Sequence, residues 1–203
     1  MNITTFQQNL DQIRAWRKIE LSHARSLAER QRKTAEEGYL CRVWAMMIYA
    51  HCDQALKLIA KEYISFLEAN PRQDYDYKTV WIAFFGKEAF KSSDIRFALC
   101  GSKDSESNIT ILQNIKGKAV LDSSNFSYHS LRFFIDWVIQ AKFDHGDYRS
   151  FCNTLKLKRD GIAHGEEITI KTVDDCLAWH EPAIRLLDDL VEATVETAVS
   201  HYR

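Results

Sequence analysis

Helix-breaking residues are scarce in this sequence, which has two prolines and seven glycines among its 203 residues. Because proline and glycine both interrupt helices, their scarcity predicts long helices with few breaks. The sequence also has no run of 18 apolar residues, so we expect no membrane-spanning helix. The first residues, MNITTFQQNLDQIRAWRK, lack the apolar stretch of a signal peptide, and we therefore expect a cytoplasmic protein.

Cysteines are few and scattered, and the net charge is close to zero. The five cysteines form no C-x-x-C pair, so we expect neither a disulfide framework nor a metal site, and no cofactor: Cys41, Cys52, Cys100, Cys152 and Cys176. Lys and Arg number 27 against 28 Asp and Glu. The overall charge therefore does not favour a nucleic-acid binder, and any such surface would have to come from local clusters of basic residues.

Apolar residues recur at helical spacing over residues 4–36 and again over residues 39–69, with Gly38 as a plausible break between the two predicted helices. Pro71 ends the second helix, because the residue before a proline is pushed out of the helical region. The length of the second helix is typical of a central pillar in a helical bundle.

The second half of the chain predicts three more helices. The last of them opens with a capping box, in which Thr172 pairs with Asp175, and runs to about residue 199, with Pro182 expected to kink or restart it. Between the two halves we expect a short helix and then an extended or irregular insertion. The predicted architecture is a single all-α domain over residues 1–203, an up-and-down helical bundle. The remaining predicted segments are residues 128–142 and 147–160 (helices), 78–90 (short helix) and 95–125 (insertion).

The stretch RDGIAHGEE, residues 159–167, places Arg159 and His164 in an R-x4-H spacing. Gly161 and Gly165 would loosen the backbone so that His164 projects beside Arg159. Arginine offers a fixed fork of donors to phosphate oxygens, and histidine titrates near neutral pH. These are the two functions that metal-free RNA cleavage needs. A helix C-terminus capped by Gly161, with basic residues near the last carbonyls, explains the same residues without any catalysis.

RDGIAHGEE resembles the signature of the HEPN superfamily, helical domains that often carry R-x4-6-H and act as metal-independent endoribonucleases. Residues 46–68 and 121–131 are similar to two stretches of the bacterial MAE-like HEPN branch, so that the resemblance covers roughly residues 40–170. It implies a homodimer in which two R-x4-H turns form one composite cleft. It also implies that Arg159 and His164 are the catalytic pair.

The resemblance assigns supporting roles less firmly. Asp160 occupies the polar position after the arginine, and Asp53 falls where the branch tends to have an acidic residue, although a solvated helix carboxylate is the preferred interpretation of Asp53. His51 lies on the apolar stripe and is expected to be a core histidine. Glu166 stands where the toxins silenced by nucleotidylation have a tyrosine, so we do not expect that control. Three lysines near the motif are either ordinary surface residues or a positive lining for RNA: Lys156, Lys158 and Lys171.

Two functions remain open on these grounds. The first is a dimeric, metal-independent endoribonuclease in a toxin–antitoxin or phage-defence system, with RNA as substrate and an antitoxin or defence protein as a possible partner. The second is a non-catalytic HEPN-type module that binds a nucleotide, RNA or protein. The intact Arg159–His164 pair favours the enzyme.

Overall fold

The computed structural model describes residues 1–72, 74–77, 112, 125–166 and 170–200, and all regular structure in these ranges is helical. Three long helices dominate: α1 (Ile3–Arg30), α2 (Glu37–Ala69) and α9 (Val173–Val199). Shorter segments make up the rest of the bundle: α7 (Tyr128–Phe133), the π-helix η1 (Phe134–Ile139), the 3-10 turn η2 (His145–Tyr148) and α8 (Arg149–Ala163). The predicted short helix over 78–90 and most of the predicted insertion over 95–125 lie outside the described residues.

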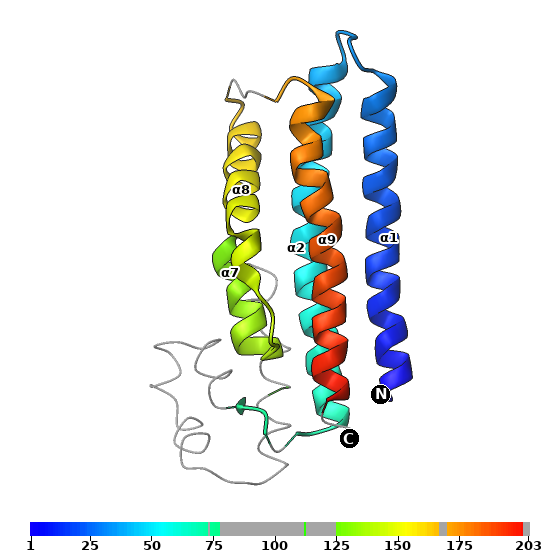
Figure 1. The fold of residues 1–203 in the computed structure, drawn as a ribbon, viewed down its shortest axis with the longest axis vertical. Coiled ribbons are helices and arrows are strands. Elements are labelled where there is room, and N and C mark those ends of the chain that lie inside the picture. Colours follow the sequence, from blue (N-terminus) through cyan, green and yellow to red (C-terminus); the bar gives the residue numbers. More distant parts are fainter. Residues whose placement is uncertain (73, 78–111, 113–124, 167–169, 201–203) are drawn as a thin grey trace.

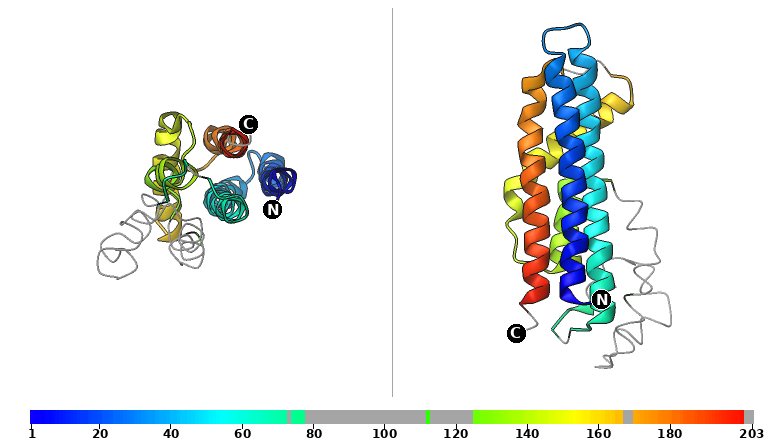
Figure 2. Two further views of the ribbon diagram at one scale, coloured as in Figure 1. Left: turned by 90° about the horizontal axis from the view of Figure 1, so that it is seen from below. Right: turned by 90° about the vertical axis from the view of Figure 1, so that its right-hand side faces the viewer.

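The helices form the predicted up-and-down bundle (Figure 1). α1 runs upward, α2 and α9 both run downward beside it, and α8 stands above α7 and η1 on the other side of α2 (Figures 1 and 2). α2 therefore contacts α1, α9, α8 and η1, which makes it the central pillar that its length and apolar stripe predict. Its buried side chains include Trp44, Tyr63 and Phe66.

The first predicted helix is too long by six residues. α1 ends at Arg30, and residues 31–36 form a turn in which Lys33 has a left-handed backbone (φ 62°). The Glu37 carboxylate accepts hydrogen bonds from the amides of Lys33 (2.6 Å) and Val173 (3.0 Å), which ties this turn to the start of α9. The break therefore precedes Gly38, which lies in the first turn of α2.

The later helices confirm the predicted pattern with shifted ends. The helix predicted over 128–142 changes to π-helical geometry at Phe134 and ends at Ile139, because Gln140 adopts a left-handed backbone (φ 57°). The Thr172–Asp175 capping box is present. α9 then continues through Pro182 without a restart.

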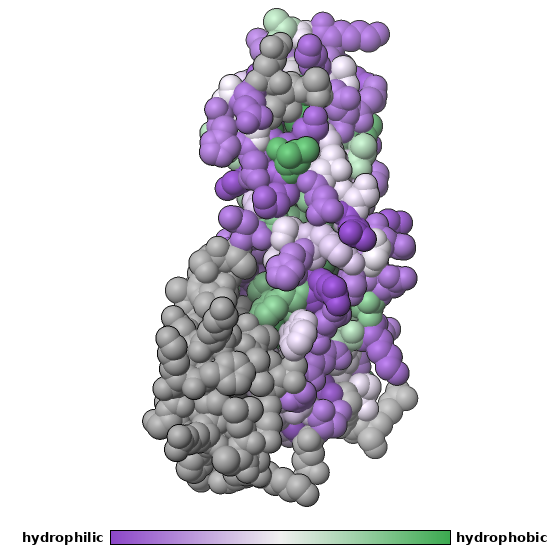
Figure 3. Space-filling view, turned by 90° about the vertical axis from the view of Figure 1, so that its left-hand side faces the viewer, coloured by the Kyte–Doolittle hydropathy of each residue, from purple (hydrophilic) through white to green (hydrophobic). Residues whose placement is uncertain are grey.

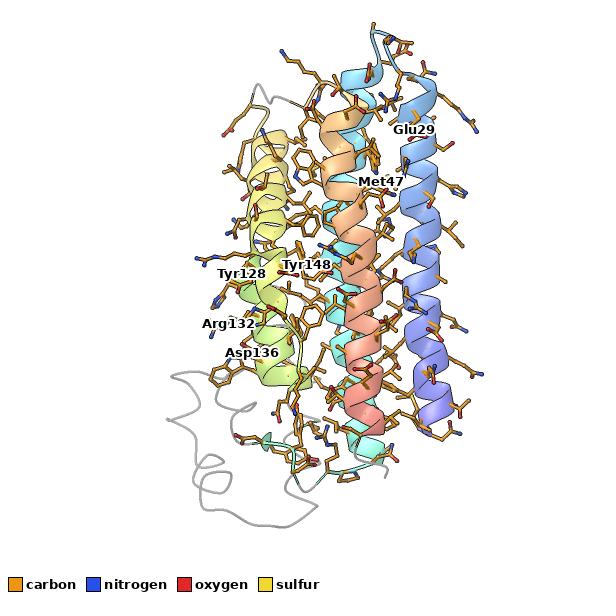
Figure 4. All side chains as sticks on the ribbon, in the orientation of Figure 1. Glu29, Met47, Tyr128, Arg132, Asp136 and Tyr148 are labelled. Carbon is orange, nitrogen blue, oxygen red and sulfur yellow. The ribbon has the colours of Figure 1, made fainter. Side chains whose placement is uncertain are left out.

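Polar contacts join α8 to its neighbours. His145, at the start of η2, contacts the Tyr128 hydroxyl through Nδ1 (2.9 Å) and Asp136 through Nε2 (3.3 Å). Asp136 also pairs with Arg132, and both side chains point away from the bundle on the outer side of α7 and η1 (Figure 4). Tyr148 points toward α9, where its hydroxyl donates to Asp189 (Figure 4). These contacts fix the lower end of α8.

The core is apolar, and no helix in the described ranges is long and apolar enough to cross a membrane. The four described cysteines are buried free thiols inside it: Cys41, Cys52, Cys152 and Cys176.

Candidate functional site

The R-x4-H motif lies at the C-terminal end of α8, and a glycine ends the helix. The Gly165 amide donates to the Ile162 carbonyl (3.1 Å) and the Glu166 amide to the Gly161 carbonyl (3.0 Å). This pair of bonds is the Schellman motif, which requires a left-handed residue at Gly165 (φ 71°). Gly161 is a buried helical residue. The expectation that Gly161 loosens or caps the helix is therefore wrong, and Gly165 is the capping glycine.

Arg159 projects from α8 toward α2 and is half-buried there. Its guanidinium carbon lies 5.0 Å from the ring centroid of Tyr49, a residue of α2. Its Nη1 donates to Asp160 Oδ1 at 2.9 Å. Nε and Nη2 make no hydrogen bond with any residue in the described ranges. The side chain as a whole is 32% exposed.

Asp160 lies between two cations of its own helix. Its second oxygen accepts a hydrogen bond from Lys156 at 2.9 Å. The hydrogen bonds from Lys156 and then from Arg159 lower the pKa of this carboxyl below its usual range. Asp160 is therefore ionised at neutral pH and fixes one edge of the Arg159 guanidinium.

His164 is the first residue beyond α8. Its amide donates to the Asp160 carbonyl (3.0 Å), and its exposed imidazole makes no hydrogen bond with the described residues. Five residues of α-helix correspond to a rotation of about 140°. Arg159 faces α2, whereas His164 is exposed, and the two described side chains form no hydrogen bond with each other within one chain.

Asp53 is not the solvated carboxylate that one prediction described. Its side chain is 15% exposed and accepts a hydrogen bond from Lys57 at 2.7 Å. Asp53 lies one turn after Tyr49 on α2, and its charge contributes to the raised pKa of the Tyr49 hydroxyl. Within the described part of the chain, no group of three or more His, Cys, Asp or Glu side chains is arranged to hold a metal ion.

Tyr49 is the residue of this site that the sequence analysis does not identify. It is 5% exposed, and burial raises the pKa of its hydroxyl, against the opposing charge of Arg159. The Phe126 backbone lies close enough to lower that pKa, but the hydroxyl makes no hydrogen bond of normal geometry with a described residue. The sequence signal for Tyr49 is its position four residues before Asp53, which places both on one face of α2.

The three lysines expected to line an RNA cleft surround the end of α8. Lys156 is bound to Asp160, and Lys171 is exposed in the segment before α9. Lys158 lies near Asp175, whose pKa is raised by burial but lowered overall by the amides of Lys171 and Thr172 and by the Lys158 charge. All three lysines therefore lie near the motif in sequence, and their role as an RNA lining stays a prediction.

Beside the motif, the outward face of α2 and the end of α8 form an apolar groove of about 440 Å³. Ile162, one turn after Arg159, contributes the α8 side of this groove. Two of its α2 residues are strongly exposed, Tyr39 at 62% and Val43 at 38%. The face formed by α8 and α7 is instead mostly hydrophilic, with isolated apolar patches (Figure 3). The groove is lined by Tyr39, Arg42, Val43, Met46, Met47, Ala50 and Ile162.

A helical bundle that carries R-x4-H at the C-terminal end of α8 is the arrangement of a HEPN-type domain. The model of the RiboL-PSP-HEPN family matches residues 12–196, and the chain belongs to this family. No curated protein and no solved structure matches the chain. Membership of the HEPN superfamily is thereby confirmed, and the MAE-like branch stays a prediction.

Proposed function

We propose that this protein is an endoribonuclease that cleaves RNA without a metal ion, through Arg159 and His164 in a cleft between two copies of the chain. The observation that carries the proposal is the Arg159 guanidinium. It is half-buried and fixed on one edge, with two nitrogens free of hydrogen bonds to the described residues. Many HEPN domains are ribonucleases, and this guanidinium is suited to hold a phosphodiester.

Arg159 would bind the scissile phosphate. A guanidinium presents parallel N–H donors that match two phosphate oxygens, and its charge stabilises the negative charge that builds up during cleavage. Asp160 occupies only Nη1, so Nε and Nη2 can form this bidentate contact. The half-buried position strengthens the interaction relative to a fully solvated arginine.

His164 would act as the general base or orient the 2′-hydroxyl. As base, its neutral imidazole takes the proton of the 2′-OH, and the 2′-oxygen attacks the adjacent phosphorus. The bond from phosphorus to the 5′-oxygen of the next nucleotide breaks, and that oxygen gains a proton. The products are a 2′,3′-cyclic phosphate and a 5′-hydroxyl. The exposed imidazole makes no hydrogen bond to a described residue, which leaves it accessible to RNA.

A second copy of the chain would complete the cleft. Within one copy Arg159 faces α2 and His164 is exposed, so a cleft that uses both side chains needs another surface opposite them. The apolar groove beginning at Ile162 provides a surface for this copy, because exposed apolar patches mark interaction sites. Docking around a two-fold axis at this groove brings two α8 ends together.

Cleavage of RNA in the presence of EDTA tests the catalytic part. We expect the wild-type chain to cut RNA and leave 2′,3′-cyclic ends. Arg159→Ala and His164→Ala should each reduce kcat/KM by about 100-fold or more, the range of a lost general base or charge-stabilising donor. Equal cleavage by all three proteins, or no cleavage by the wild type, would contradict the proposal.

Sedimentation tests the second copy. Val43→Glu places a charge in the groove and is expected to convert a dimer into a monomer and to abolish cleavage. Leu157→Glu is the matched control, because Leu157 is 71% exposed on α8 and does not line the groove. It should leave the dimer intact. A wild-type monomer that still cleaves RNA would refute the composite cleft.

A non-catalytic binding module is the second candidate, and one observation favours it. Arg159 already holds the Asp160 carboxylate, an internal anion, and forms no hydrogen bond with His164 in one copy. Such a module would bind RNA or a nucleotide with an affinity that depends on Arg159 but not on His164, and it would leave RNA intact. A biological role in toxin–antitoxin or phage-defence systems, with a protein partner that restrains the activity, follows from the HEPN resemblance alone and is part of the proposal.

A further inference from the structure

The contact between Arg159 and Tyr49 joins the motif to α2. The guanidinium carbon lies 5.0 Å from the centre of the tyrosine ring. The guanidinium also donates a hydrogen bond to the Asp160 carboxylate at 2.9 Å. Tyr49 is 5% exposed and is held by an edge contact with Phe126, at 5.9 Å between ring centroids. The ring is therefore a rigid surface, whereas Asp160 is a neighbour on the same helix and moves with Arg159.

We infer that Tyr49 is a positioning residue that holds the Arg159 guanidinium, through a cation–π contact, in the orientation that binds the scissile phosphate. This inference rests on the proposed function. An arginine side chain has many rotamers, and a flat aromatic surface restricts the guanidinium to one plane. With Asp160 on Nη1 and the ring against one face, Nε and Nη2 are left for the ligand.

The contact acts through the ring and not through the hydroxyl. Burial raises the pKa of Tyr49, so the phenol is neutral at physiological pH and Arg159 meets a π face instead of a phenolate. The hydroxyl makes no hydrogen bond of normal geometry with the described residues. A phenylalanine at position 49 would therefore preserve the contact, whereas a leucine would fill similar space without a π system.

Substitutions at position 49 test the role of the ring. Tyr49→Leu is expected to reduce kcat/KM for RNA about tenfold, and Tyr49→Phe should recover most of that loss. Phenylalanines with one, two or three ring fluorines keep the shape and progressively weaken the π face, so they should lower kcat/KM stepwise. A flat fluorine series, or a Tyr49→Leu protein as active as the wild type, would overturn the inference.

A matched control separates positioning from stability. Phe66→Leu removes another buried aromatic ring from α2, where it stacks on Phe6 far from α8, and should destabilise the fold while leaving kcat/KM unchanged. If Phe66→Leu lowers cleavage as much as Tyr49→Leu, the effect is one of general stability and the inference is wrong.

A measurement without RNA distinguishes failure of this inference from failure of the proposed function. A ring current shifts protons above its face upfield in NMR spectra. The Arg159 side-chain protons should be shifted upfield in the wild type and in Tyr49→Phe, and should return to ordinary positions in Tyr49→Leu. Absence of the shift in the wild type contradicts the positioning role even if RNA is cleaved. Its presence in a protein that cleaves no RNA contradicts only the ribonuclease.

Discussion

The seam between α1 and α9 and the seam between α2 and α8 use charged residues in opposite ways. Cations of α1 or the turn after it meet carboxylates of α9: Lys18 with Asp188, Arg25 with Glu181 and Arg32 with Asp174, each at 2.9 Å. Among ion pairs between described residues, none joins α2 to α8. Charges there pair within one helix, as in Asp53 with Lys57 and Asp160 with Lys156 and Arg159.

The difference separates charges that hold the bundle together from charges that remain available to a ligand. On the α1–α9 side, Lys18, Arg25 and Arg32 each have a carboxylate on α9. On the α2–α8 side, the contact of Arg159 with the facing helix is an aromatic ring, which orients a cation without neutralising it. On the α2–α8 side the carboxylate partner of Arg159 therefore comes from its own helix, and the facing helix contributes an aromatic ring.

Replacing arginine by lysine on both seams should give the largest contrast. Arg159→Lys keeps the charge but loses the planar fork, so we expect RNA cleavage to fall at least tenfold. Arg25→Lys, on the α1–α9 seam, should change neither cleavage nor the free energy of unfolding by more than about 0.5 kcal/mol, as is usual for exposed ion pairs. Cleavage assays and urea titrations measure both. Equal effects of the two substitutions would remove the functional distinction between the seams.

Neutralising carboxylates should again give the larger effect on the α2–α8 side, this time in the free energy of unfolding. Asp53→Asn removes the carboxylate that lies 2.7 Å from the Lys57 ammonium, where both side chains are largely buried, and should lower the free energy of unfolding by about 2 kcal/mol. Asp188→Asn, in a pair whose carboxylate is 31% exposed, should cost about 0.5–1 kcal/mol. Denaturant unfolding gives both values. A smaller loss for Asp53→Asn than for Asp188→Asn would show that the α2 pair is effectively solvated.

The pH dependence of stability tests the local pairing of Asp160. Its folded pKa is depressed, so its pairs stabilise the protein above the unfolded pKa, near 4, and this stabilisation is lost as the pH falls through the lower folded value. The wild type should exceed Asp160→Asn by about 0.5 kcal/mol from pH 8 to pH 5, since the site is about one-third exposed. The difference should shrink as the pH falls below about 4. If the stability difference between the wild type and Asp160→Asn grew as the pH fell, the depressed pKa of Asp160 would be contradicted.

The sequence predicts the parts of this molecule that depend on local pattern. The apolar stripe of residues 39–69 predicts α2, and R-x4-H identifies Arg159 and His164. The break between the first two helices lies before Gly38, and not at Gly38, where the sequence predicts it, because the turn over residues 31–36 is held by Glu37. The Glu37 carboxylate accepts a hydrogen bond from the amide of Val173, which is distant in the sequence. Local sequence patterns allow either Gly161 or Gly165 to cap the C-terminus of α8. Only the left-handed backbone conformation of Gly165 shows that it is the cap.

The contact of Arg159 with Tyr49 could not be predicted in this way. It joins residues 110 positions apart and depends on how α8 packs on α2. The i, i+4 spacing of Tyr49 and Asp53 indicates a common face of α2 but does not reveal which helix that face meets. The candidate site is thus a local motif completed by a non-local aromatic contact.

The smallest expected effect concerns the Tyr49 hydroxyl and sharpens the role assigned to its ring. Because the buried hydroxyl makes no hydrogen bond of normal geometry with the described residues, Tyr49→Phe removes a desolvated polar group at no cost in protein contacts. The free energy of unfolding should rise by a few tenths of a kcal/mol, as measured by urea titration. Tyr148→Phe is the matched control: its hydroxyl donates to Asp189, so the same change should destabilise the fold. A loss of stability in Tyr49→Phe equal to that in Tyr148→Phe would mean that the Tyr49 hydroxyl has a partner of its own, and the α2–α8 contact would then rest on more than the ring.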